Sequence, residues 1–424
     1  MQTLLSQKFT AYIGIDWADT KHDVCLQVGG ETQRHFSVID HTPQSIDRWA
    51  KSLFERYGAP IPIAIALELN KGPLVTALQK YEFFCLFPIN PSTLAKHRKT
   101  FVGSGAKDDP TDAQWALELL LTHPQRFPQL MPQSPAMRIL ASLTEHRRAL
   151  VDERVKVSNR LICTLKQYYP LVLELFNDHA TVVFCDFLMR WPTLEHIKGS
   201  RQSAFLKFFN EHNARHPQLN QARWEIISKA MPLTQDPGVI RPSQLYATAL
   251  ASQLKGLIST IKDFDREIEE TANTLADYPI FKALPGAGQH LAPRLMVAFG
   301  EQRERFSDAN AMQRYAGIAP VTQRSGKKKV VHWRYQCATF LRQTFVEWAA
   351  HSITQSTWAE AYYRQQRAKG CSYQAALRAL AFKWIRIVYQ CWKTSTVYDE
   401  KTYLLALTQR GSTLIEAPME VSTG

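Results

Sequence analysis

Four acidic residues stand where carboxylates are either costly or closely spaced. Asp16 lies inside the apolar run YIGIDWA, and Glu68 is the lone acid of IPIAIALEL. A carboxylate in a buried strand is unfavourable unless it is paired or binds a metal. Asp109 and Asp112 are three residues apart in KDDPTDA, where Pro110 favours a first helical turn and puts both acids on one helix face.

Four converging carboxylates can hold one or two Mg²⁺ (or Mn²⁺) ions, which orient a nucleophile and stabilise charge on phosphodiester oxygens. Two alternatives stay open at this point. Asp108 can replace Asp109 as the ligand, and Glu68 or Asp112 taken alone can be a solvated acid, in the case of Asp112 one favoured by the helix dipole.

A serine stands among basic residues in RSGKKK, residues 324–329. Such a cluster can position a phosphate and stabilise the charge that develops when the Ser325 hydroxyl attacks it. The predicted nucleic-acid contacts in this segment are Arg324, Lys327, Lys328 and Lys329. The simpler alternative is a flexible basic loop with no chemistry.

A glycine-containing turn, LPGAG at 284–288, resembles the turn of a helix-hairpin-helix. Gly286 and Gly288 would let backbone N–H groups approach a phosphate. An ordinary turn between two helices has the same composition. The sequence therefore predicts a nucleic-acid contact here without excluding a purely structural turn.

The charge of the chain points to a polyanionic partner. The 424 residues carry a formal net charge of +13, and residues 324–393, which include the predicted contact Arg342, hold thirteen Lys or Arg against two acids. Seven cysteines form no C-x-x-C pair, which excludes a zinc knuckle. No run approaches the roughly 18 apolar residues of a membrane span, and the N-terminus lacks a signal-peptide pattern. We expect a cytoplasmic protein with no membrane partner.

The first 130 residues predict the elements that must position the acids. Strands are expected at 12–18, 22–28, near 32–38, at 61–69 and at 83–89, with helices at 42–57, at 74–80 and from about 110. Three antiparallel-prone strands followed by helix, strand, helix, strand is the order of a ribonuclease-H-like (RuvC-like) α/β fold. In such a sheet the first strand, the fourth strand and the last helix converge at one end.

The rest of the chain reads as helical. Residues 131–278 contain two long amphipathic helices, one at 135–168 and one whose seam has 4-3 spacing. Either two antiparallel helices or a dimerising coiled coil would bury these seams. An aromatic-rich insert at about 170–242 is expected to form a small helical subdomain. A mostly helical domain at 279–410 and a loose tail at 411–424 follow.

Together these motifs resemble one family: the insertion-sequence transposases with a DEDD RuvC-like domain, which include the Piv-type DNA invertase and the bridge-RNA-guided recombinases. GIDWA at 14–18, LEL at 67–69 and KDDPTDA at 107–113 look like its acidic motifs, and DREIEE at 265–270 looks like its coiled coil. LPGAGQHLAPRLMVAFG and YAGIAPVTQRSGKKK look like its C-terminal transposase domain.

The resemblance implies a metal-binding tetrad and a serine nucleophile, Ser325, that forms a covalent phosphoserine link to DNA. The tetrad would be Asp16, Glu68, Asp109 and Asp112. It also implies donor and target DNA, a structured non-coding guide RNA, association with the bacterial nucleoid when bound to DNA, and dimers that assemble into a tetramer. In that assembly the carboxylates of one subunit serve the serine of another.

The sequence departs from the family in two places. Where the family usually shows a Lys-Gly-Asn-like turn before Leu-Arg, this chain has HWRYQCATFLR at 332–342. The insert at 170–242 also makes the chain longer than the compact bridge-RNA members.

Three other classes of protein compete with a recombinase. A junction resolvase or a DEDD exonuclease would use the carboxylates to activate water, although the exonucleases usually carry D-x-E in the first strand and position 18 here is alanine. An actin-like sugar or acetate kinase needs a Gly-Thr-rich phosphate loop that Asp19-Thr20-Lys21 does not supply. A nucleic-acid-binding protein with a degenerate core would show no carboxylate-dependent Mg²⁺ binding.

Overall fold

The computed structural model describes residues 9–57, 62–101, 109–326, 328–335, 337–412 and 414, with the side chains of Asp109 and Lys329 outside that description. The chain divides into two compact units, Met1–Pro132 and Gln133–Gly424. Within the described residues, no helix is long and apolar enough to cross a membrane.

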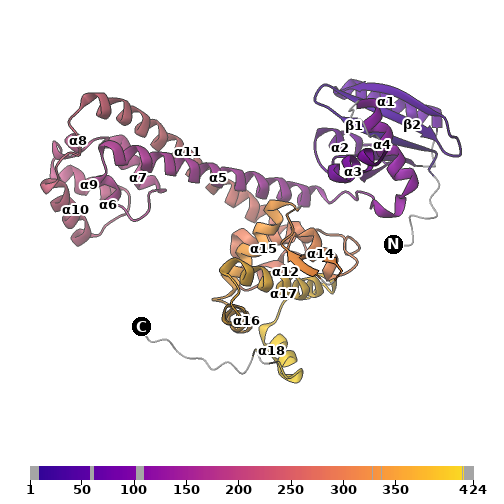
Figure 1. Ribbon diagram of the computed structural model, residues 1–424. Coiled ribbons are helices and arrows are strands. Elements are labelled where there is room, and N and C mark those ends of the chain that lie inside the picture. The colour runs from indigo at the N-terminus through magenta and orange to yellow at the C-terminus, as the bar shows by residue number, and fades with distance from the viewer. Residues whose placement is uncertain are drawn as a thin grey trace. The chain divides into compact units, whose positions relative to one another are not determined.

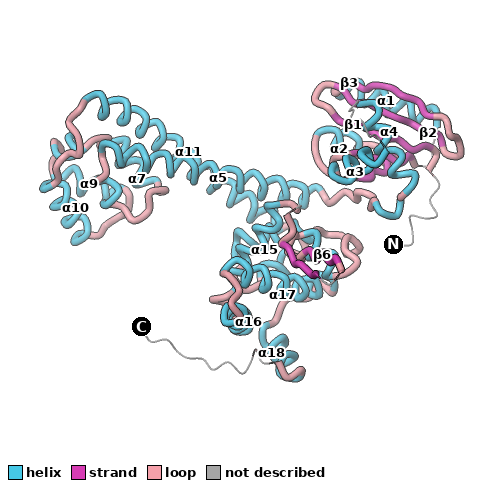
Figure 2. The backbone as a smooth tube through the Cα atoms, in the orientation of Figure 1, coloured by secondary structure: helices cyan, strands magenta, loops and turns pink. Residues whose placement is uncertain are grey.

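The first unit is built on a five-stranded sheet with the strand order β3-β2-β1-β4-β5. Figures 1 and 2 show this sheet with helices packed against it. Strands β1, β2 and β3 are antiparallel neighbours, whereas β4 and β5 run parallel to β1. The strands are β1 (Ala11–Trp17), β2 (Lys21–Val28), β3 (Arg34–Asp40), β4 (Ile63–Leu67) and β5 (Phe84–Pro88). The helices are α1 (Pro43–Tyr57), α2 (Pro73–Leu78), α3 (Pro91–Phe101) and α4 (Asp109–Thr122), followed by the short 3₁₀ turn η1 (Pro124–Arg126).

Helix α4 covers one face of this sheet, and a single glycine allows it to approach. A Cβ at Gly14 would lie 2.0 Å from the carbonyl oxygen of Ala113 in α4, so no other residue fits there. Cys25, opposite Gly14 in the register, packs on Ala113 and Leu117 of the same helix. Because side chains alternate along a strand, Asp16 lies on the same face as Gly14. The opposite face carries the larger apolar cluster with α1 and α2.

The second unit contains two long helices, α5 (Pro135–Tyr168) and α11 (Pro237–Asn273), which pack along each other. The start of α5 shares a buried cluster with the end of α11, as Leu140 does with Ile268. The end of α5 shares another with the start of α11, as Leu161 does with Leu250. The two helices are therefore antiparallel partners within one chain, which is the first of the two arrangements expected from the sequence.

The insert between the long helices is helical, as predicted. Its helices are α6 (Leu171–Glu174), α7 (Val182–Arg190), α8 (Leu194–Lys198), α9 (Gln202–Glu211) and α10 (Pro217–Lys229). Its aromatic side chains form a buried cluster with the end of α5 and the first half of α11, in which Phe187 contacts Phe205, Phe208 and Phe209. The aromatic richness of this segment is thus explained by its own core.

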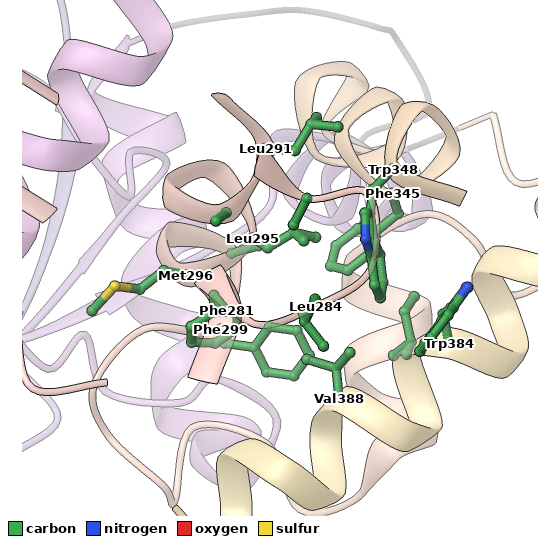
Figure 3. Close-up of a cluster of buried hydrophobic side chains, with 14 of the residues drawn as sticks. Phe281, Leu284, Leu291, Leu295, Met296, Phe299, Phe345, Trp348, Trp384 and Val388 are labelled. Atoms are coloured by element: carbon green, nitrogen blue, oxygen red, sulfur yellow. The ribbon is translucent and has the colours of Figure 1, made fainter. Parts of the chain in front are cut away.

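The remaining residues form a helical bundle and one β-hairpin. The elements are α12 (Tyr278–Lys282), α13 (Gly288–Phe299), α14 (Ala309–Tyr315), β6 (Val321–Ser325), β7 (Lys328–His332), α15 (Thr339–Ser352), α16 (Thr357–Ala368), α17 (Tyr373–Lys393) and α18 (Glu400–Gln409). Trp348 and Trp384 lie with Phe299 and Phe345 in its core (Figure 3). The expected loose tail at 411–424 falls almost wholly outside the described residues.

Candidate active-site residues

Asp16 and Glu68 come to the same edge of the sheet. The register pairs Ile15 of β1 with Leu67 of β4 in parallel, so the next residues along the two chains are Asp16 and Glu68. Both acids are partly exposed, and Glu68 follows β4 directly. The structure therefore places two of the four predicted acids at neighbouring positions on the α4 side of one sheet edge.

A further acid, Asp23, faces Asp16 from β2 and was not predicted. The two residues are directly opposite in the antiparallel register, and Asp23 is only 5% exposed. Side chains at opposed positions project on the same face with Cβ atoms about 5 Å apart, and like charges there are destabilising. The sequence signal is the same as for Asp16, a lone acid within an apolar strand, here HDVCLQV.

Asp112 is held by an arginine. Nη1 of Arg98, on α3, donates to both carboxylate oxygens of Asp112, at 2.6 and 2.8 Å. The Asp112 side chain is 6% exposed, so this guanidinium supplies the counter-charge that a buried carboxylate needs. No local spacing indicates this partner, because Arg98 and Asp112 belong to different helices.

The described residues do not by themselves form a complete metal site. Asp109 begins α4, but its side chain and the whole of Asp108 lie outside the described residues, so the choice between these two ligands stays open. Among the residues that are described, no three acidic, histidine or cysteine side chains gather closely enough to hold an ion together. The register puts Asp16 next to Glu68 and opposite Asp23, and Asp112 is paired with Arg98.

Ser325 lies at the tip of a β-hairpin that the sequence did not predict. It is the last residue of β6 and pairs with Lys328, the first residue of β7. Gly326, in the turn, has φ +55°, a left-handed conformation that suits glycine. The side chains of Arg324, Ser325 and Lys328 are exposed, whereas Lys327 and the Lys329 side chain are outside the description. A basic ribbon therefore presents the serine to solvent.

The glycine turn at 284–288 does connect two helices, α12 and α13, as expected. Gly286 has φ +71°, and a Cβ there would lie 2.6 Å from the backbone of His351 in α15. Trp348 Nε1 also donates to the carbonyl of Pro285 at 2.9 Å. Packing thus accounts for Gly286 without a phosphate, while Gly288, with φ +53°, has open space around it.

Arg342, the remaining predicted contact, lies beside an aromatic ring. It belongs to α15, and its guanidinium carbon is 4.5 Å from the ring centroid of Trp333. Trp333 follows β7 directly, so Arg342 lies next to the base of the hairpin that carries Ser325.

Two family models match the chain. Residues 13–170 match a DEDD model of the IS110 group, described as "Transposase". Residues 278–364 match a model described as "Transposase IS116/IS110/IS902 family". The first match indicates use of a divalent metal. An α/β unit that carries the acids and a helical unit that carries the basic hairpin are thus the two parts of an insertion-sequence transposase, an enzyme that acts on DNA.

Curated relatives agree with this class. The chain is 28% identical over 412 residues to a "Mini-circle putative transposase for IS117" of Streptomyces coelicolor, covering 94% of this chain and 98% of the relative. It is 27% identical over 386 residues to an "Insertion element IS116 uncharacterized 44.8 kDa protein" of Streptomyces clavuligerus, covering 89% and 93%. The two models together span more than half of the chain, which belongs to the IS116/IS110/IS902 transposase family.

Proposed function

We propose that this transposase cuts and rejoins DNA through a covalent phosphoserine at Ser325, assisted by a divalent cation on the N-terminal carboxylates. The observation that carries the proposal is the exposed serine at the tip of a basic hairpin, in a chain whose other unit gathers acids on one sheet edge. A metal site alone would serve hydrolysis, whereas a serine in a phosphate-binding setting serves transfer.

The N-terminal unit is proposed to be ribonuclease-H-like, in the RuvC-like form. The sheet order β3-β2-β1-β4-β5, with antiparallel β1 to β3 and parallel β4 and β5, supports this assignment. The contact between Gly14 and Ala113 brings α4, and with it Asp112, to the face that carries Asp16.

The donor set suits a hard cation such as Mg²⁺ or Mn²⁺, because every candidate ligand is a carboxylate oxygen. Asp16, Glu68, Asp109 and Asp112 would hold it. The register supports a cation there, because it puts Asp16 next to Glu68 and opposite Asp23. Asp112 is paired with Arg98 and would have to exchange this guanidinium for the cation. When bound, the cation would stabilise charge on the attacking and leaving oxygens of a phosphodiester.

The covalent step needs no outside energy source, because the phosphoserine link conserves the energy of the phosphodiester bond. The Ser325 hydroxyl loses its proton as Oγ forms a bond to phosphorus, and the bond from phosphorus to one deoxyribose oxygen breaks. That oxygen leaves as a hydroxyl after taking up a proton. A deoxyribose hydroxyl from another strand can then attack the phosphoserine, releasing Ser325 and sealing the new junction. Arg324 and Lys328, exposed on either side of the serine, would bind the phosphate oxygens.

The alternative is a Mg²⁺-dependent RuvC-like junction resolvase or nuclease that uses water. The carboxylates favour it, because they belong to a unit that is compact without the hairpin. The two mechanisms differ in whether the DNA becomes covalently linked to the protein. Incubating the protein with end-labelled element-end DNA and denaturing it should leave label on the protein, and peptide mapping should place it on Ser325. Free cleaved DNA with no adduct would support the nuclease instead.

The partners are proposed to be donor and target DNA, a structured non-coding guide RNA, and further copies of the chain assembling as dimers and tetramers. The net charge of +13 supports a polyanionic partner, and the resemblance to bridge-RNA-guided recombinases supports RNA. Purification from cells that carry the whole element should yield a complex with one discrete transcript and the mass of an oligomer. Recovery of a monomer without a discrete RNA would remove both from the account.

A further inference from the structure

Two arginines share one tryptophan ring at the base of the hairpin. Arg342 and Arg378 each place the guanidinium carbon 4.5 Å from the ring centroid of Trp333. They come from different helices, α15 and α17. We call Trp333, Arg342 and Arg378 the arginine clamp.

The clamp carries two positive charges. Arg342 donates to the carbonyl of Arg334 at 3.1 Å, and among the described residues neither arginine pairs with a carboxylate. Glu347 lines the same cavity but is engaged by Arg148 and Arg294, at 3.3 and 2.7 Å. Burial, and then the neighbouring charge of Arg342, lower the pKa of Arg378 from its ordinary value. Two cations held together against their repulsion favour a bound anion.

The space beside the clamp has the size and lining of a small-ligand site. A cavity of about 350 Å³ is bounded by the three clamp residues together with Thr339, Gln343 and Gln374. Outside it, Tyr335 is 78% exposed, and its ring centroid is 5.9 Å from that of Trp333. An exposed aromatic ring beside cationic side chains is the arrangement that holds unpaired bases in single-strand-binding proteins.

We propose that the arginine clamp and Tyr335 bind one unpaired nucleotide, with the phosphate in the cavity that both arginines line and the base stacked on the tyrosine. The site would hold a strand that has left its duplex. It lies at the base of the hairpin, where Trp333 follows β7, at the opposite end of the ribbon from Ser325. This inference rests on the proposed recombinase function for its role but not for its binding chemistry. A DNA strand or an RNA strand offers the same phosphate and base.

The test is a binding titration with the full-length protein. Fluorescence anisotropy would follow labelled oligothymidylate, oligouridylate and a duplex of equal length over a range of salt concentrations. Arg378→Gln should weaken single-strand binding about tenfold and flatten the salt dependence by about 0.7 in log–log slope, since one phosphate contact is lost. Tyr335→Ala should weaken it about tenfold with the slope unchanged, because a stacked base carries no charge.

Arg386→Gln is the matched control, since Arg386 is exposed on the same helix α17 and loses the same charge. It should change the affinity by less than about twofold. Equal losses for Arg378→Gln and Arg386→Gln, or losses as large on the duplex as on single strands, would overturn the clamp. A preference between the thymidine and uridine probes would support it and identify the strand. Binding is measured without cleavage, so the two proposals can fail separately. The clamp can bind single strands even if no adduct forms at Ser325, and an adduct can form at Ser325 even if the clamp does not bind.

Discussion

Ser325→Ala is expected to abolish strand exchange, lowering its rate at least about 10³-fold, the scale on which loss of a covalent nucleophile acts. The protein should keep its fold, because Ser325 is exposed at a hairpin tip and surface substitutions change stability by about 0.5 kcal/mol or less. DNA binding should also persist, since Arg324 and Lys328 remain. The measurement is recombinant product formed from donor and target DNA, with the thermal midpoint recorded for each variant.

Thr322→Ala is the matched control for this change. Thr322 is exposed on the same strand β6 and loses the same kind of hydroxyl, so its exchange rate should stay close to that of the parent. If Ser325→Ala still exchanged strands, the phosphoserine mechanism would be wrong. If it lost exchange but still cut DNA at the parent rate, water would be the nucleophile and the carboxylates would act alone.

Asp16→Asn should remove metal-dependent cleavage, again by about 10³-fold, because loss of a ligand forfeits several kcal/mol of stabilisation of the transferring phosphate. A second readout does not depend on activity. Mg²⁺ should raise the thermal midpoint of the parent protein, as any ligand of the folded state does, and should leave that of Asp16→Asn nearly unchanged. In chelator the variant should unfold at about the same midpoint as the parent, because Asp16→Asn keeps the size of the side chain at a partly exposed position.

Asp19→Asn is the control here, because Asp19 is an exposed acid in the turn after β1 and undergoes the same isosteric change. It should keep both cleavage and the Mg²⁺-dependent rise in stability. An Asp16→Asn variant that Mg²⁺ still stabilises as strongly as the parent would show that the cation binds elsewhere. Loss of stability in chelator would instead indicate a structural role for Asp16.

The α/β and helical division of the chain could be predicted because periodicity is a local signal. The spacing of apolar residues indicates the five strands of the first unit and the two long helices, and these elements follow one another along the chain as expected. Helix α3 was not expected. The hairpin β6–β7 was missed because its strands are exposed and basic, so they lack the buried alternation that marks a strand. Its only signal was the glycine at position 326.

The contacts of the candidate site were harder to foresee than its residues. Asp16, Glu68 and Asp112 were singled out as acids in unusual places, but pairings with them depend on the three-dimensional register. Asp23 becomes relevant only once β2 lies opposite β1, and Arg98 only once α3 lies beside α4. Likewise, the link between Trp333 and Arg378 joins residues that are far apart in the chain and share no motif.

The hairpin that carries Ser325 has little of its own to hold it in place. From Thr322 to Ser325 every side chain of β6 is exposed, and a two-stranded ribbon by itself is only marginally stable in water. Among the described residues, the buried core of the same unit includes no side chain of β6 or β7. Substitutions in the ribbon should therefore cost little folding stability, so the segment that carries Ser325 can change in sequence without endangering the fold.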